Sequence, residues 1–235
     1  MHVICEWGLS GVEALMNRAD DFVIVDVLSF STCVDVACAR GARVFPFPIF
    51  DRQAAENEAY RLDAELAGKR SDLRAKYTLS APSLQIIPAN TRLVLPSPNG
   101  SHISFAAKEK PLFAGCLRNA SAVAKAASKI AGEGTVAIIP AGERWKDRSL
   151  RPAIEDLLGA GAIISQMDGA LSSEALVAKD AFLSARNDIS NRLFDSVSGI
   201  ELVESGFPQD VEIASELDVS NCAPTLIDGA YIASA

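Results

Sequence analysis

The sequence predicts an α/β fold with a mostly parallel sheet covered by helices on both faces. Three observations carry this prediction. Runs of β-branched residues such as 22–28 are almost entirely apolar, as strands buried on both faces are. Each run is followed by a turn signal and by a stretch with helical periodicity. Hydrophobic residues make up 49% of the 235 residues, which is enough to bury a core.

The expected elements alternate along the chain. The expected strands cover residues 22–28, 42–47, 93–95, 112–114 and 135–139. The expected helices cover residues 31–39, 51–67, a stretch that begins near 101, 119–131, and a stretch that begins at 152. Gly41 and Gly68 end the first two helices, and Asp51 is the expected N-cap of the second. Pro152 stands in the first turn of the last helix, where proline is favoured.

The remaining segments are less regular. Residues 69–89 are expected either to build a second, smaller α/β lobe or to cover the site. The chain is mainly helical between about 171 and 206, and an extended piece is expected at 225–232. We therefore expect a single α/β unit over residues 1–235. Whether this unit divides into sub-lobes stays open.

Charge and cysteine usage narrow the class of partner and compartment. The chain has 22 Lys and Arg residues against 30 Asp and Glu residues, a net charge of −8. This balance argues against binding to nucleic acid or to an anionic membrane surface. No run approaches the roughly 18 apolar residues of a membrane span, no signal peptide is recognisable, and the scattered cysteines suit a reducing compartment. We expect a cytoplasmic protein that acts on a small molecule, and assembly as a homodimer stays open.

Polar residues gather at four of the expected strand-to-helix junctions. These residues are Asp26, Ser29, Ser31, Asn99, Ser101, Arg118, Asn119, Glu143 and Asp156, and Gly100 lies among them. Ligands of open parallel sheets bind beyond the carboxyl ends of the strands. We therefore expect these junctions to meet at one edge of the sheet and to form the site.

An anion pocket is predicted from two of the junctions. The helix starts near Ser101 and Asn119 expose backbone N–H groups, and the helix dipole favours an anion there. Arg118 adds a guanidinium, which pairs well with phosphate oxygens. Structural interpretations also exist, because Asn119 is a common kind of N-cap and Arg118 suits a charged surface.

A magnesium site is predicted from the acidic residues of the junctions. Asp26, Glu143 and Asp156 supply hard oxygen ligands of the kind that Mg²⁺ prefers. Asp156 also suits the first turn of a helix, where a carboxylate complements the dipole. Asp26 is the hardest to explain structurally, because a carboxylate in an apolar strand is costly to bury unless it is paired or ligated.

Several other mechanisms lack their motifs in this sequence. The chain has 2 histidines and no Arg-His-Gly motif, which argues against a phosphohistidine phosphatase. Neither Cys33 nor Cys116 has an arginine at Cys-x5-Arg spacing, and Asp26 is not part of an Asp-x-Asp pair. P-loop, Gly-x-Gly-x-x-Gly and zinc-ligand patterns are absent as well.

The order and spacing of the junction motifs resemble the 2-phosphosulfolactate phosphatase family, Mg²⁺-dependent enzymes named for a step in coenzyme M biosynthesis. The motifs that carry the resemblance lie at residues 25–28, 97–101, 115–120, 139–145, 155–161, 198–202 and 209–211. The resemblance implies an α/β fold and Mg²⁺-dependent hydrolysis of a phosphate monoester on a small α-hydroxy acid. Carried over by position, it implies a site formed by Asp26, Asn99, Gly100, Arg118, Asn119, Glu143 and Asp156.

The sequence also departs from the family pattern. Ser29 stands where the family usually has arginine, and Gly68-Lys69-Arg70 stands where it has Gly-Glu-Arg. These departures lie in segments expected to contact an anionic substrate.

The leading hypothesis is therefore a Mg²⁺-dependent phosphatase whose substrate resembles 2-phosphosulfolactate. The expected catalytic residues are Asp26, Ser31, Arg118 and Glu143, and the expected metal ligands are Asp26, Glu143 and Asp156. The expected substrate contacts are Ser29, Asn99, Gly100, Ser101, Arg118 and Asn119. Direct attack by water and a covalent intermediate on Asp26 or Ser31 both stay open. The alternative is a non-catalytic binder of a phosphorylated or sulfonated metabolite.

Overall fold

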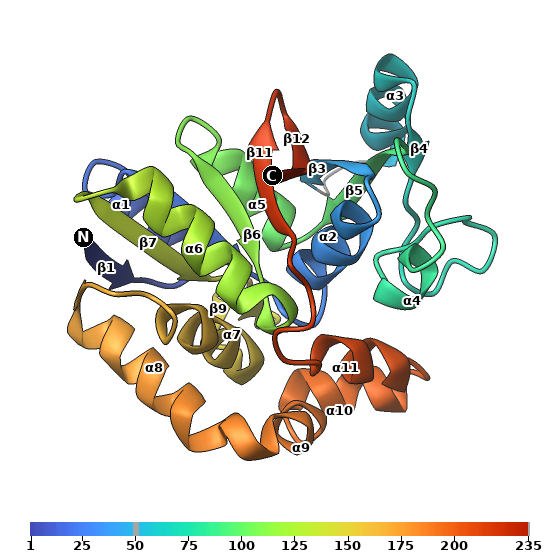
Figure 1. Cartoon of the computed structure of the whole chain (residues 1–235). Coiled ribbons are helices and arrows are strands. Elements are labelled where there is room, and N and C mark those ends of the chain that lie inside the picture. Colours follow the sequence, from blue (N-terminus) through green and yellow to red (C-terminus); the bar gives the residue numbers. More distant parts are fainter. Residues whose placement is uncertain (49–51, 235) are drawn as a thin grey trace.

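The computed structural model describes residues 1–48 and 52–234 (Figure 1). Within these residues, ten strands form one sheet in the order β10-β1-β7-β2-β6-β11-β12-β3-β5-β4, and β8 and β9 form a separate two-stranded sheet. Most neighbours in the large sheet are parallel, and helices pack around it. The predicted α/β class with a mostly parallel sheet is confirmed.

One parallel block forms the half of the sheet that holds the N-terminus. Its strands are β1 (His2–Cys5), β2 (Asp21–Val25), β6 (Leu112–Gly115), β7 (Thr135–Pro140) and β10 (Ala170–Leu171). Strand β2 lies between β6 and β7 and is parallel to both. It ends at Val25, three residues before the end of the predicted strand. Asp26 therefore lies just beyond the strand, where its backbone N–H donates to the Ser31 hydroxyl at 3.0 Å.

A second parallel block is joined to the first by a hairpin. The block contains β3 (Arg43–Pro48), β4 (Glu65–Leu66) and β5 (Arg92–Ser97), and the hairpin contains β11 (Ala223–Ile227) and β12 (Ala230–Ser234). The pairs β6–β11, β11–β12 and β12–β3 are all antiparallel, so the two blocks run in opposite senses along the sheet. The extended piece predicted at the end of the chain is thus a hairpin, with Asp228 and Gly229 both at positive φ in its turn.

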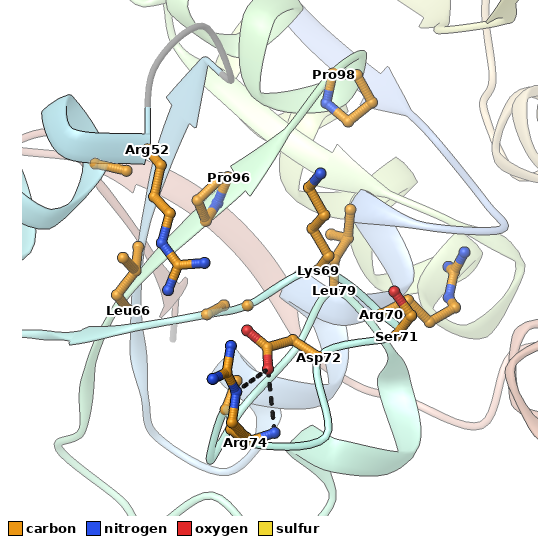
Figure 2. Close-up of a pocket in the computed structure, with 14 residues that line it drawn as sticks. Arg52, Leu66, Lys69, Arg70, Ser71, Asp72, Arg74, Leu79, Pro96 and Pro98 are labelled. Carbon is orange, nitrogen blue, oxygen red and sulfur yellow. Dashed lines mark hydrogen bonds and ion pairs between the residues drawn. The ribbon is translucent and has the colours of Figure 1, made fainter.

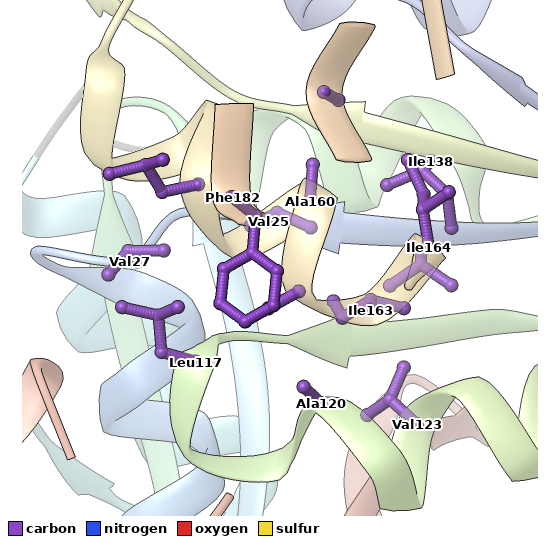
Figure 3. Close-up of a cluster of buried hydrophobic side chains, with 14 of the residues drawn as sticks. Val25, Val27, Leu117, Ala120, Val123, Ile138, Ala160, Ile163, Ile164 and Phe182 are labelled. Atoms are coloured by element: carbon purple, nitrogen blue, oxygen red, sulfur yellow. The ribbon is translucent and has the colours of Figure 1, made fainter. Parts of the chain in front are cut away.

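Strand β2 sends alternate side chains to opposite faces of the sheet, and each face carries helices. Val23 and Val25 join a core cluster with α6 (Ala120–Ala131), α7 (Ile154–Ile164) and α8 (Ser173–Ala185). Figure 3 shows part of this cluster, which includes Phe182 of α8 and Val25 of β2. Phe22 and Ile24 join the cluster on the other face, with α1 (Gly8–Leu15), α2 (Phe30–Ala39) and α5 (Gly100–Ala107). The predicted cover on both faces is confirmed.

The remaining helices and strands are short. They are α3 (Arg52–Leu62), α4 (Ala81–Leu84), β8 (Glu143–Arg144), β9 (Leu150–Arg151), α9 (Ile189–Phe194), α10 (Val197–Glu204), α11 (Pro208–Ala214), and the 3-10 turns η1 (Leu117–Asn119) and η2 (Arg186–Asp188). Helix α3 ends earlier than predicted, because the chain turns at Asp63 (φ 48) and continues into β4. The predicted N-cap, Asp51, lies outside the described residues.

The structure bears on two expectations, the absence of a membrane span and the presence of reduced cysteines. Within the described residues, no helix has the length and apolarity that a membrane crossing requires. All five cysteines are buried and free of disulfides. The cytoplasmic location stays a prediction.

Candidate active site

Asp26 connects the N-termini of two helices. Its Oδ1 accepts a hydrogen bond from the backbone N–H of Phe30, the first residue of α2, at 3.2 Å. Its Oδ2 accepts one from the backbone N–H of Gly100, the first residue of α5, at 2.9 Å. Helix N-termini stabilise negative charge, so both helices favour the carboxylate form. The sequence left open that Asp26 has a purely structural role. The two N–H donors give its buried carboxylate hydrogen-bond partners, which is part of what such a role requires.

Burial nevertheless dominates the electrostatics of Asp26. Loss of hydration is the largest cause and the nearby Glu143 carboxylate the next, and the resulting pKa of Asp26 is about 7. The two backbone N–H bonds and the Arg70 guanidinium oppose this rise. A carboxyl with such a pKa is poised between its neutral and charged forms, and a cation beside it would favour the charged form.

Asp156 lies beside Asp26 in the first turn of α7. Its Oδ1 accepts from the backbone N–H of Val27 at 2.7 Å, and its Oδ2 accepts from that of Gly142 at 2.8 Å. Burial raises the pKa of Asp156 well above its usual range, and the charge of Asp26 is the next cause. The carboxylate thus holds together the two loops that follow β2 and β7.

Glu143 completes the acidic group from β8. Its Oε2 accepts from the Asn99 amide Nδ2 at 2.9 Å. Burial raises the pKa of Glu143, while the Asn99 hydrogen bond lowers it. The structure therefore brings together the predicted residues Asp26, Asn99, Gly100, Glu143 and Asp156.

These acidic residues suit a hard divalent cation on electrostatic grounds. Asp26 and Asp156 are buried and Glu143 is partly buried, and each interacts repulsively with at least one of the others. Within residues 1–48 and 52–234, no group of three or more His, Cys, Asp or Glu side chains is arranged to hold a metal by itself. Mg²⁺ is usually held by one or two carboxylates with waters and substrate oxygens. The donor set fits an ion whose coordination is completed by water and substrate.

The turn at the start of α5 is closely packed. A Cβ added at Gly100 would lie 2.4 Å from the Phe30 ring, so a side chain there would displace α2. The Ser101 hydroxyl is buried and donates to the Leu95 carbonyl at 2.9 Å. Ser29, at the N-cap of α2, is half-buried close to Asp26 in the chain.

The Ser31 side chain is buried in the turn that follows Asp26. Its hydroxyl donates to the Ile24 carbonyl at 3.0 Å and accepts from the Asp26 backbone N–H at 3.0 Å. Both contacts fix the turn between β2 and α2. The structure thus gives this hydroxyl two backbone partners next to the acidic group.

Arg118 belongs to a different polar network. Its guanidinium donates to the buried Asp35 carboxylate at 3.0 Å and pairs with Glu216. Asp35 also accepts from the Ser220 hydroxyl at 2.6 Å. Among the described residues, no hydrogen bond or ion pair joins Arg118 to Asp26, Glu143 or Asp156.

The Asn119 side chain makes its hydrogen bonds within its own turn. Its Oδ1 accepts from the Cys116 backbone N–H at 2.8 Å, and its Nδ2 donates to the Ala114 carbonyl at 3.2 Å. The side chain is fully buried. This junction therefore closes on itself: the Asn119 side chain caps the turn η1 at Cys116 and, within the described residues, makes no capping hydrogen bond to α6, unlike the N-cap expected from the sequence.

Arg70 is the cation that sequence reasoning did not place in the site. Its Nη2 donates to the Leu28 carbonyl at 2.9 Å, next to Ser29, and its Nε lies 3.4 Å from the Asp210 carboxylate. Its field lowers the pKa of Asp26. The sequence signal was the Gly68-Lys69-Arg70 run, but the surrounding segment gave no regular pattern. Arg70 thus places positive charge close to Ser29, the position at which the family usually has arginine.

Asp210 holds Arg70 in place from α11. Besides the ion pair, the Asp210 carboxylate accepts from the Ser80 hydroxyl at 2.8 Å and from the Ala81 backbone N–H at 3.2 Å. It is buried. These contacts tie α11 to the segment that carries Arg70.

A cavity of about 920 Å³ adjoins this site (Figure 2). Arg70 and Pro98 both line it, and Pro98 directly precedes the Asn99-Gly100 turn. The site is therefore next to a space large enough for a small-molecule ligand.

The fold and this site define the class: an α/β protein whose candidate active site joins buried carboxylates to helix N-termini and an arginine. A family model described as 2-phosphosulpholactate phosphatase matches residues 12–229. The chain therefore belongs to the 2-phosphosulpholactate phosphatase family, and it is an enzyme of the phosphoric monoester hydrolase class. The family resemblance predicted from the sequence is confirmed.

Individual relatives match over most of their length. A protein of Methanothermobacter thermautotrophicus named 2-phosphosulfolactate phosphatase is 31% identical over 210 residues, which cover 88% of this chain and 87% of the relative. A protein of Pseudothermotoga lettingae named "Probable 2-phosphosulfolactate phosphatase" is 28% identical over 217 residues, covering 91% and 92% of the two chains. A protein of Carboxydothermus hydrogenoformans with that same name is 30% identical over 226 residues, covering 90% and 89%.

Proposed function

We propose that this protein is a Mg²⁺-dependent phosphatase that hydrolyses a phosphate monoester of a small anionic hydroxy acid such as 2-phosphosulfolactate. The observation that carries the proposal is the meeting of the Asp26, Glu143 and Asp156 carboxylates beside the N-termini of α2 and α5. Family membership supports the reaction class. A role in coenzyme M biosynthesis and assembly as a homodimer stay predictions.

In this proposal the acidic group holds the metal. One or two of Asp26, Glu143 and Asp156 would bind Mg²⁺ directly, with the lone pairs that their backbone and amide donors leave free, and the others would act through water. When bound, Mg²⁺ supplies charge neutralisation at the phosphoryl group and lowers the pKa of a bound water. Asn99 orients Glu143 through their hydrogen bond.

The phosphoryl oxygens are held by the basic side of the site. Arg70 and the N-terminus of α5 at Ser101 supply positive charge and N–H donors toward the oxygens. Water adds to phosphorus, the ester P–O bond breaks, and the proton of the water ends on the released hydroxyl. The Ser31 hydroxyl already has two backbone partners, so we assign the attack to water rather than to Ser31.

Phosphate release from 2-phosphosulfolactate tests the function. We expect turnover by the purified protein with millimolar Mg²⁺ and none in excess chelator. Hydrolysis in H₂¹⁸O should place one ¹⁸O in the phosphate, with inversion at phosphorus if attack is direct. Tight binding of the ester without turnover under any divalent metal would instead establish the non-catalytic binder.

Replacement of Arg70 tests its contact with the phosphoryl oxygens. We expect Arg70→Lys to lower kcat/KM at least about tenfold, because an ammonium does not reproduce the two-pronged guanidinium contact. The matched control is Arg61→Lys, since Arg61 lies on α3 and pairs with Glu58 at the surface. Equal kcat/KM values for wild type and Arg70→Lys would remove Arg70 from the site.

Replacement of Arg118 separates structure from catalysis. We propose that Arg118 stabilises the fold through Asp35, so Arg118→Met should lower the free energy of unfolding by about 3 kcal/mol, since a buried carboxylate loses its partner. The kcat/KM of the folded variant should stay within about twofold of wild type. Urea denaturation and phosphate release measure the two quantities. A large loss of kcat/KM with unchanged stability would restore Arg118 to the predicted catalytic set.

A further inference from the structure

The cavity that Arg70 and Pro98 line has room for more than a phosphate. Its described lining includes an apolar wall of Leu66, Leu79, Pro96 and Pro98, together with the alanines of residues 55, 67 and 75. Its volume of about 920 Å³ lies in the range of pockets that take drug-sized ligands. A phosphoryl group and a three-carbon acid would leave most of this wall uncovered.

Positive charge is concentrated on the same cavity. Its described lining contains Arg52, Lys69, Arg70 and Arg74 against one carboxylate, Asp72. This excess of cations makes the cavity a favourable place for a second anionic group.

Among the described residues, the three arginines each lie near a carboxylate, but Lys69 does not. Arg52 pairs with Glu56 at 2.9 Å, and Arg74 lies 3.9 Å from Asp72. Within the part of the chain that the structure describes, no carboxylate lies within ion-pair distance of the Lys69 ammonium. Figure 2 shows the Lys69 side chain extending toward Pro98, which directly precedes Asn99 in the chain. Lys69 is exposed and lines the cavity, so its ammonium is available to an anionic group of a ligand that lies near Pro98.

We propose that this cavity binds the leaving group of the substrate, and that the substrate class is a phosphate ester whose hydroxy acid carries an apolar body and a second anionic group. This rests on the proposed function. The apolar body lies on Leu66, Leu79, Pro96 and Pro98, and Lys69 pairs with the second anion. 2-Phosphosulfolactate would fill only part of this cavity, so larger esters of the same class are expected to react at higher kcat/KM.

Three synthetic phosphate esters test the proposal. They are the 2-O-phosphates of lactate, 3-phenyllactate and 3-(4-carboxyphenyl)lactate. For wild type with Mg²⁺ we expect kcat/KM to rise at least about fivefold from lactate to phenyllactate, because the ring leaves water. A further rise is expected for the carboxyphenyl ester, which gains the Lys69 contact. Calorimetric binding of the same esters in chelator should follow the same order.

Variants of two lysines in the same segment identify the contact. Lys69→Ala should bring the ratio of carboxyphenyl to phenyl ester kcat/KM close to one. Lys76→Ala should keep the wild-type ratio, since Lys76 is exposed, pairs with Glu65 and does not line the cavity.

The outcomes separate this inference from the proposed function. Turnover of all three esters at similar kcat/KM, or a Lys69→Ala variant with the wild-type ratio, would overturn the cavity assignment while the phosphatase stands. Graded, Lys69-dependent binding in chelator without any turnover in Mg²⁺ would support the cavity as a ligand site and overturn the phosphatase.

Discussion

Asp26→Asn is expected to lower kcat/KM by about three orders of magnitude. The carboxylate is the proposed metal ligand that also joins the first residues of α2 and α5. An amide removes the charge that would hold a divalent cation. It also sets an NH₂ group against one of the two backbone N–H donors. The relief of repulsion with Glu143 offsets this loss, so stability in chelator should stay close to that of wild type.

Thermal unfolding in chelator and in millimolar Mg²⁺ tests whether Asp26 binds the metal. Wild type should melt at a higher temperature with Mg²⁺, because a ligand that binds only the native state stabilises it. Asp26→Asn should lose this shift together with activity. Asp21→Asn is the matched control for the Mg²⁺ shift, since Asp21 begins strand β2 whereas Asp26 directly follows the other end of that strand. A Mg²⁺ shift of equal size in Asp26→Asn would show that Asp26 is not a ligand.

The meeting of Asp26 with the Gly142–Glu143 loop could be predicted from the sequence. Strands β2 and β7 are adjacent and parallel, so their carboxyl ends lie side by side. The apolar runs that predicted both strands therefore also predicted this part of the site.

The position of Asn99 and Gly100 has a different cause from the one expected. Strand β5 belongs to the second block, which runs opposite to β2, so a shared strand edge does not explain the contact with Asp26. Helix α5 packs against β2, β3, β5 and α1, and this packing brings its first residue to the carboxylate. The intervening hairpin is indicated in the sequence by the Asp228-Gly229 pair, which suits its tight turn.

Arg70 and Arg118 show why single cations are hard to place from sequence. Each is positioned by an acidic residue far away in the chain, Arg70 by Asp210 and Arg118 by Asp35. Local pattern cannot report such pairs, because the partner is brought by the tertiary fold. A strand-to-helix junction favours Arg118 for anion binding, yet the fold gives its charge to a buried carboxylate.

Asp21 should make the stability of this protein depend on pH. It begins β2, is fully buried, and neither of its side-chain oxygens accepts a hydrogen bond from another described residue. Burial raises its pKa from 3.8 to about 7, and the neighbouring Asp20 contributes to the rise. Between these values the native state binds more protons than the unfolded state, so stability falls as pH rises. The full effect corresponds to at most about 4 kcal/mol, at 1.36 kcal/mol for each pKa unit.

Asp21→Asn is therefore expected to stabilise the protein increasingly as pH rises. Its advantage over wild type in free energy of unfolding should grow by about 3 kcal/mol between pH 5 and pH 8, since the amide does not ionise. Urea denaturation at the two pH values measures this growth. The control is Asp147→Asn, because the exposed Asp147 carboxylate has a lowered pKa, from its hydrogen bonds with Ser149, and stays ionised in both states. An Asp21→Asn advantage that does not change with pH would mean that the Asp21 carboxyl is solvated or paired in the native protein.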